Sequence, residues 1–259
     1  MYYGLQLSAS GILTGMYRTD ALSNNLANIN TTGFKPDMVF TRQRSVVREE
    51  DAIRSLPSNT LLEKLGAGVH LAANQVDFTQ GPIQQTGNDL DLAIQGDGFF
   101  VLSDISDGST ESIRLTRDGR FTQDANRRLI SATTGLPVMS ASNQPITLRE
   151  GSAVQIDQDG YLRQDGAIVA RLQLLNIPDT DELTRAGGNQ FIPSTTGYAN
   201  RLPATGRIHQ GAIEASSVSD INALLDFQSA ARSVGANTRI AGYHDEIMNR
   251  AINTFGRIA

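Results

Sequence analysis

The C-terminal part of the chain carries one apolar stripe with the spacing of a long helix. Its residues follow one another at alternating gaps of three and four: Leu224, Phe227, Ala231, Val234, Thr238, Ala241, Asp245, Met248, Ile252 and Phe255. Only Thr238 and Asp245 are polar in this heptad pattern, which is typical of a coiled coil. A helix from about 217 to 257 would be about 60 Å long, longer than one ordinary domain needs.

The N-terminal part of the chain repeats the same kind of stripe. The residues at alternating gaps of four and three are Leu5, Ala9, Ile12, Met16, Thr19, Ser23, Leu26 and Asn30. Gly33 and Pro36 mark the expected end of this helix. A short amphipathic helix commonly packs on a neighbouring domain, but the C-terminal helix would overhang any small β domain. Because soluble monomers rarely expose long apolar stripes, we expect the two helices to pair as a coiled coil and to mediate oligomerisation.

The middle of the chain has the pattern of an all-β domain. Five Asp-Gly pairs all lie between 97 and 166, and Asp-Gly between alternating residues is a strong hairpin signal. We therefore expect a hairpin in which Ile113–Arg117 and Arg120–Thr122 pair across Asp118 and Gly119. The alternation of Ile168, Ala170, Leu172 and Leu174 predicts another strand.

The predicted fold class is α+β, with terminal helices flanking a central all-β domain. The expected regions are an N-terminal coiled-coil helix (1–32), an extended connecting region (33–84), the central β domain (85–210) and a C-terminal coiled-coil helix (211–259).

Composition excludes several classes of function. The 27 acidic residues outnumber the 22 basic ones, whereas a nucleic-acid or acidic-membrane binder needs a positive field. The absence of cysteine removes disulfides, thiolate nucleophiles and cysteine-ligated zinc. No apolar run approaches about 18 residues, so we expect no membrane span, and the first residues have no pattern of a cleaved signal peptide.

The motifs of catalytic and cofactor-binding proteins are incomplete in this chain. His70, His209 and His244 lie far apart, and each is better interpreted as a surface residue than as a metal ligand. Gly96-Asp97-Gly98 precedes a strand-like run instead of a helix, so it does not predict a dinucleotide site. The segment Asp157–Gly160 is better interpreted as a turn than as a calcium loop. We therefore expect no catalytic residues, no metal and no cofactor.

One alternative class remains open at this point, a secreted β-rich carbohydrate-binding or hydrolytic protein with helical extensions. Paired carboxylates for glycoside hydrolysis would meet only in the folded chain, so the sequence does not decide on them. The absence of Trp and the 6% share of aromatic residues speak against this alternative.

Several segments, in order along the chain, resemble the motifs of the bacterial flagellar rod and hook proteins. Leu22–Lys35 closely resembles the N-terminal signature A-N-N-L-A-N-x-x-T-x-G-F-K. Leu90–Phe100 is similar to the second family motif, and Leu115–Gly119 is similar to Y-T-R-D-G with Leu115 in place of tyrosine. Gly211–Ser219 resembles G-x-x-E-x-S-N-V-N, and Arg232–Ile240 resembles a degraded R-A-Y-E-A-N-x-K-x-I.

The resemblance implies a structural subunit of the flagellar basal-body rod. In that family the terminal helices pair in an inner tube, the β domain lies outside, and subunits stack helically into a rod that transmits torque. The implied partners are copies of the chain, other axial proteins of the rod and hook, and the flagellar type III export apparatus. The implied location is the periplasmic rod, reached without a cleaved signal peptide, and neither nucleic-acid binding nor membrane insertion is implied. The ending Asn249–Arg257 looks more like one rod subtype than like the distal rod protein, which stays the near alternative.

The expected assembly interface consists of residues on the two terminal helices. They are Leu5, Ile12, Met16, Asn24, Asn25, Leu26, Asn28, Leu224, Phe227, Val234, Ala241, Met248, Ile252 and Phe255. Asparagine amides supply donors and acceptors that would bridge neighbouring helices, although Asn28 and Asn30 alternatively only end the helix. Gly33 is expected to adopt a left-handed conformation at the helix exit. Gly235 and Gly242 either let a neighbouring helix approach closely or only weaken the helix, at about 1 kcal/mol each.

Overall fold

The computed structural model describes residues 3–46, 49, 66–103 and 113–255. The chain divides into two compact units. We call residues 1–27, 37–75 and 219–259 the helical unit, and residues 28–36 and 76–218 the β unit.

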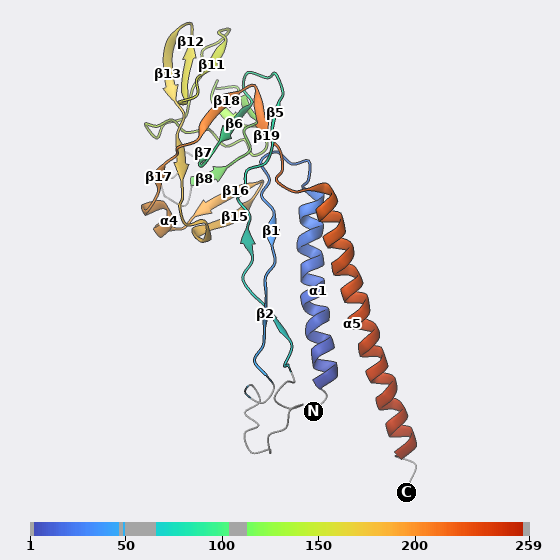
Figure 1. The fold of residues 1–259 in the computed structure, drawn as a ribbon. Coiled ribbons are helices and arrows are strands. Elements are labelled where there is room, and N and C mark those ends of the chain that lie inside the picture. Colours follow the sequence, from blue (N-terminus) through green and yellow to red (C-terminus); the bar gives the residue numbers. More distant parts are fainter. Residues whose placement is uncertain (1–2, 47–48, 50–65, 104–112, 256–259) are drawn as a thin grey trace. The chain divides into compact units, whose positions relative to one another are not determined.

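Two long helices, α1 (Tyr3–Ala27) and α5 (Asp220–Phe255), lie side by side and antiparallel in the helical unit (Figure 1). The predicted pairing of the terminal helices is therefore confirmed. The first helix is shorter than expected, because the chain turns after Ala27. In that turn the Thr31 N–H donates to the Asn28 carbonyl at 3.0 Å, and the Thr31 hydroxyl donates to the Asn28 side chain at 3.1 Å. Asn28 thus contributes to ending the helix.

The helical unit also contains an antiparallel ribbon of two short strands, β2 (Thr41–Gln43) and β3 (Val69–Leu71). A ribbon of two strands is marginally stable by itself, so it needs a packing surface. The β3 strand packs beside α1, and the Asn74 amide donates to the Tyr17 hydroxyl at 2.7 Å. Two further strands, β1 (Asp37–Met38) and β4 (Gln75–Val76), flank the ribbon in the sequence. Much of the remaining predicted connecting region, at 47–48 and 50–65, lies outside the described residues.

The β unit is built around a six-stranded sheet in the order β15-β16-β8-β7-β14-β17. A three-stranded sheet, β11-β12-β13, and the antiparallel pairs β9–β10, β6–β18 and β5–β19 complete it. The strands are β5 (Ile83–Gln85), β6 (Leu92–Gln95), β7 (Phe99–Ser103), β8 (Ile113–Thr116), β9 (Phe121–Gln123), β10 (Leu129–Ser131), β11 (Val154–Ile156), β12 (Tyr161–Gln164), β13 (Ala167–Arg171), β14 (Leu174–Asn176), β15 (Leu183–Gly187), β16 (Gln190–Pro193), β17 (Leu202–Pro203), β18 (Arg207–Gln210) and β19 (Ala212–Glu214). Two short helices, η2 (Thr180–Glu182) and α4 (Thr195–Ala199), lie between the last strands.

Strand β7 is buried on both faces and separates two hydrophobic clusters. Successive side chains of a strand point to opposite faces. Accordingly, Phe99 and Val101 pack in one cluster with Phe191, whereas Phe100 and Leu102 pack in the other. The central β7 strand therefore holds the core of the β unit together.

The expected hairpin across Asp118 and Gly119 is wrong. Strand β8 pairs with β7 and β16, and β9 pairs with β10 instead. Gly119 allows the backbone of β6 to approach closely. The Gly119 carbonyl accepts a hydrogen bond from the Leu92 N–H at 2.9 Å, and an added Cβ would lie 1.6 Å from the Leu92 oxygen. A side chain at this position would therefore collide with the backbone of β6.

Another Asp-Gly pair does form the predicted tight turn. Asp165 and Gly166 have φ values of 51° and 78°, and Gln164 and Ala167 pair across them at the start of the β12–β13 hairpin. The turn expected at Asp157–Gly160 connects β11 to β12. The predicted strand from Ile168 onward is divided between β13 and β14.

Candidate assembly interface

The face of α5 that packs against α1 is a continuous heptad stripe, which we call the seam. Its residues are buried or half-buried, whereas the rest of α5 as far as residue 254 is exposed. The seam residues are Ala223, Phe227, Ala230, Val234, Asn237, Ala241, His244 and Met248. Their gaps alternate between four and three, as a helix–helix contact of the coiled-coil type requires.

Half of the seam lies one residue away from the stripe that the sequence predicts. Phe227, Val234, Ala241 and Met248 belong to both. The other heptad position holds Ala223, Ala230, Asn237 and His244, one residue before the expected Leu224, Ala231, Thr238 and Asp245. Because small residues allow two helices to approach, the seam buries Ala223 and Ala230 and leaves Leu224 47% exposed.

The facing side of α1 consists of small residues. An added Cβ on Gly4 would lie 2.6 Å from the His244 ring, and one on Gly15 would lie 2.7 Å from Val234 Cγ2. Between them Ser8 is buried, and its hydroxyl donates to the Gly4 carbonyl at 3.0 Å. The two backbones therefore approach closely. The sequence analysis missed this face, and the glycine and serine spacing of α1 was the available signal.

The predicted interface residues of α1 lie on a neighbouring face, outside this seam. Leu5 and Met16 are 40% and 52% exposed, and Ile12 and Leu26 are half-buried. On α5, Ile252 is 66% exposed. The helix pair thus leaves a second set of apolar side chains on its surface. Phe255 is the last residue of α5, and its side chain lies outside the described part of the structure.

The predicted asparagines have different environments. The Asn25 side chain is buried and makes two hydrogen bonds with the backbone of Asp37, to its carbonyl at 2.9 Å and from its N–H at 3.0 Å. It therefore fixes the chain that follows α1 within the same subunit. Asn24 is exposed on α1, and Asn28 lies in the turn after the helix. Gly33 has the expected left-handed conformation, with φ of 64°.

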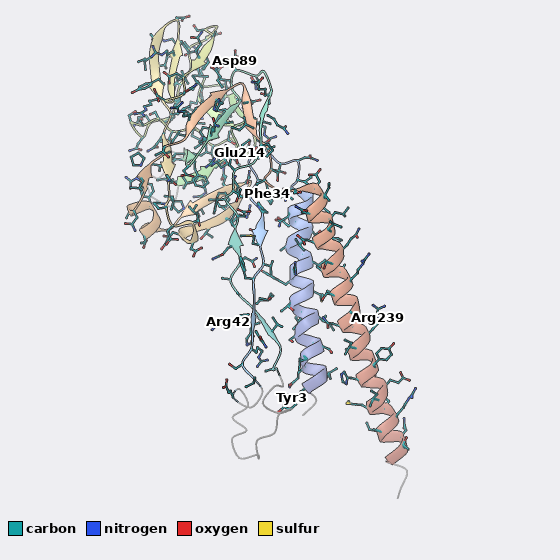
Figure 2. The ribbon with its side chains drawn as sticks, viewed as in Figure 1. Tyr3, Phe34, Arg42, Asp89, Glu214 and Arg239 are labelled. Carbon is teal, nitrogen blue, oxygen red and sulfur yellow. The ribbon has the colours of Figure 1, made fainter. Side chains whose placement is uncertain are left out.

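Gly235 and Gly242 lie on the exposed surface of α5. An added Cβ at either position would meet nothing within 4 Å in the described chain. Arg239, between them, lies on the side of α5 that faces away from α1 (Figure 2). Neither glycine is needed for the contact with α1.

A buried charge cluster in the β unit joins three of the sequence motifs. We call Lys35, Arg117 and Glu214 the junction cluster. The Lys35 ammonium lies 2.5 Å from one Glu214 oxygen, and the Arg117 guanidinium lies 3.1 Å from the other. The side chains of Lys35 and Glu214 are fully buried, and that of Arg117 is 6% exposed. Figure 2 shows Glu214 beside Phe34, the neighbour of Lys35.

Backbone groups make further hydrogen bonds with the junction cluster. The Lys35 ammonium donates to the Thr79 carbonyl at 2.7 Å, and Arg117 donates to the Gly96 carbonyl at 2.8 Å. The Gly81 N–H donates to a Glu214 oxygen at 3.0 Å. The cluster therefore joins the segment that follows α1 to β19 and to the residues directly after β6 and β8. Sequence analysis identified the motifs but missed that their charged residues meet.

Burial lowers the pKa of Lys35, and Arg117 acts in the same direction, although Glu214 opposes both. Between the lowered pKa and 10.5, the unfolded chain binds more protons than the folded chain, so the contribution of Lys35 to the free energy of unfolding rises with pH. We expect the stability of the natural protein, relative to a Lys35→Met variant, to increase with pH between the lowered pKa and 10.5. Urea unfolding at several pH values checks this prediction, and a difference that stays constant with pH contradicts it.

The three histidines lie in different elements of the described structure. His70 is in β3, His209 in β18 and His244 in the seam, and no group of three or more His, Cys, Asp or Glu in the described ranges could hold a metal ion. Among the helices that the structure describes, none has the length and apolarity needed to cross a membrane.

Comparison with known proteins identifies the family. Residues 93–164 match the model of the flagellar hook protein FlgE/F/G D1 domain, and residues 16–35 match that of the flagella basal body rod protein. The chain is 34% identical to the flagellar basal-body rod protein FlgF of Caulobacter vibrioides, over 100% of this chain and 98% of the relative. It is 31% identical to FlgF of Mesorhizobium japonicum, over 92% of each chain, and 29% identical to the rod protein FlgG of Borreliella burgdorferi, over 98% of each. The chain belongs to the family of flagellar basal-body rod proteins.

Proposed function

We propose that this protein is a structural subunit of the flagellar rod that polymerises helically through its terminal helices and transmits torque. The observation that carries this proposal is the surface of the helix pair. Leu13 of α1 is 66% exposed and Tyr243 of α5 is 64% exposed, and α1 contains only two charged residues, Arg18 and Asp20. Exposed apolar side chains on a helix with as few charges as α1 are typical of a protein interface.

The proposed partners are copies of this chain and other axial proteins of the rod and hook. We further propose that the chain is exported by the flagellar type III apparatus without a cleaved signal peptide and is located in the periplasmic part of the rod. It has no catalytic role, binds no nucleic acid and does not insert into the membrane. The FlgF-type ending at Asn249–Arg257 favours an FlgF-like position, with the FlgG-like position as the alternative. The comparisons give no support to a carbohydrate-binding function.

Deletion of the gene tests the proposed function. We expect the deletion to abolish motility and to leave basal bodies with an incomplete rod in electron micrographs, and a plasmid copy to restore both. Intact rods and normal motility after the deletion would overturn the proposal.

Limited proteolysis of the isolated full-length chain tests whether the helices depend on assembly. We expect a resistant fragment that spans about 85 to 210, with cleavage first in the terminal segments. The physical reason is that the helix pair has one buried seam and several exposed apolar side chains, whereas β7 is buried on both faces. Mass spectrometry of the fragments checks this, and termini as resistant as the middle would count against a role in assembly.

A further inference from the structure

A second apolar stripe runs along α5, outside the seam. It consists of Ala236, Ile240, Tyr243 and Ile247, at gaps of four, three and four. All four residues are exposed, Ile240 by 46% and Ile247 by 63%. We call it the outer α5 stripe. Each stripe residue directly precedes a seam residue and so lies about 100° round the helix from it. All four are exposed, so α1 of the same chain does not cover the outer α5 stripe.

An apolar stripe of the same length lies on α1. It consists of Leu5, Ala9, Ile12 and Met16, also at gaps of four, three and four. Leu5, Ala9 and Met16 are exposed and Ile12 is half-buried. We call it the outer α1 stripe. Since the order of gaps is the same read in either direction, the two stripes match in both the antiparallel and the parallel orientation, and size and charge decide between these.

Size favours this antiparallel match. It places Tyr243 opposite Ala9 and Met16 opposite Ala236, so that the tyrosine and the methionine each face an alanine. Alternation of large and small residues across facing positions allows helices to interdigitate. The other two facing pairs are aliphatic on both sides: Ile12 with Ile240, and Leu5 with Ile247.

Charge favours the same register. Asp20, the only acidic residue of α1, follows Met16 by four residues. Arg232 precedes Ala236 by four residues on α5. Both residues are exposed in the subunit, and the antiparallel match brings their opposite charges to the same end of the contact.

We propose that the outer α5 stripe of one subunit docks antiparallel on the outer α1 stripe of a second copy of this chain. This inference rests on the proposed function and specifies which faces meet. The contact joins different surfaces of the two copies, so each copy keeps one stripe for the next neighbour. Contacts of this heterologous kind generate rings or open helical filaments, whereas two identical stripes pairing with each other would close a dimer.

Cysteine cross-linking tests the proposal. The natural chain contains no cysteine, so only the introduced cysteines can form disulfides. Two differently tagged full-length variants, Leu5→Cys and Ile247→Cys, are purified, mixed at high concentration and oxidised with copper phenanthroline. A product that carries both tags arises only between copies. The matched control replaces Ile247→Cys by Ala236→Cys, which lies opposite Leu5 only if the helices are parallel.

We expect the two-tag product for Leu5→Cys with Ile247→Cys, and at least tenfold less for Leu5→Cys with Ala236→Cys. Circular dichroism of each variant checks that it folds, and Ala9→Cys with Tyr243→Cys provides a second antiparallel pair. Absence of the product from both antiparallel pairs, or a preference for the parallel control, overturns the inference. Loss of motility on gene deletion combined with absent cross-links would leave the proposed function intact and reject only this contact.

Discussion

Replacing Glu214 by Ala is expected to lower the free energy of unfolding of the β unit by about 3–5 kcal/mol, because it removes the anion of a buried ion cluster. Lys35 and Arg117 would stay buried without the carboxylate whose oxygens lie 2.5 and 3.1 Å from them. The Gly81 N–H would lose its acceptor as well.

Urea unfolding followed by circular dichroism measures this effect. The matched control is Glu150→Ala, which removes the carboxylate of an exposed ion pair with Arg127. The two side chains of that pair are 80% and 54% exposed, so its loss is expected to cost at most about 1 kcal/mol. Equal destabilisation by the two substitutions would show that the junction cluster does not stabilise the fold.

The heptad patterns predicted the two terminal helices because the spacing that marks a helix involves residues only three and four apart in the sequence. The four residues Phe227, Val234, Ala241 and Met248 belong to the predicted stripe and to the seam. The other half of the seam could not be predicted from α5 alone, because it depends on the partner face. Gly4 and Gly11 of α1 leave room there for His244 and Asn237, so the most apolar stripe of α5 is not the most buried.

The junction cluster could not be predicted because its members are distant in sequence. Lys35 and Glu214 are 179 residues apart, and only the folded β unit brings them to 2.5 Å. The failed hairpin at Asp118 and Gly119 has a similar cause. A local turn signal there was overridden by tertiary pairing, since β8 finds partners in β7 and β16 and Gly119 approaches β6.

Replacing Gly15 by Leu is expected to separate α1 from α5 and to abolish motility. The first added carbon would already lie 2.7 Å from Val234 Cγ2, closer than carbon atoms approach in proteins, and Leu adds three more carbons. Val234 is β-branched and has one strongly preferred rotamer in a helix, so it does not move aside easily. Overpacking of this kind typically costs about 1–3 kcal/mol. Hydrogen exchange of the α1 amides measures the opening of the pair, and we expect faster exchange along the helix.

The matched control introduces the same side chain where the structure leaves room. At Gly235 an added Cβ meets nothing within 4 Å in the described chain, and Leu is a better helix former than Gly by nearly 1 kcal/mol. Gly235→Leu is therefore expected to slow amide exchange in α5 of the isolated subunit. If Gly235→Leu also abolishes motility, a neighbouring subunit covers Gly235 in the rod, because the subunit itself tolerates the change.

If Gly15→Leu leaves exchange in α1 unchanged, the close contact of the two helices does not stabilise the pair, and the glycine face of α1 needs another explanation.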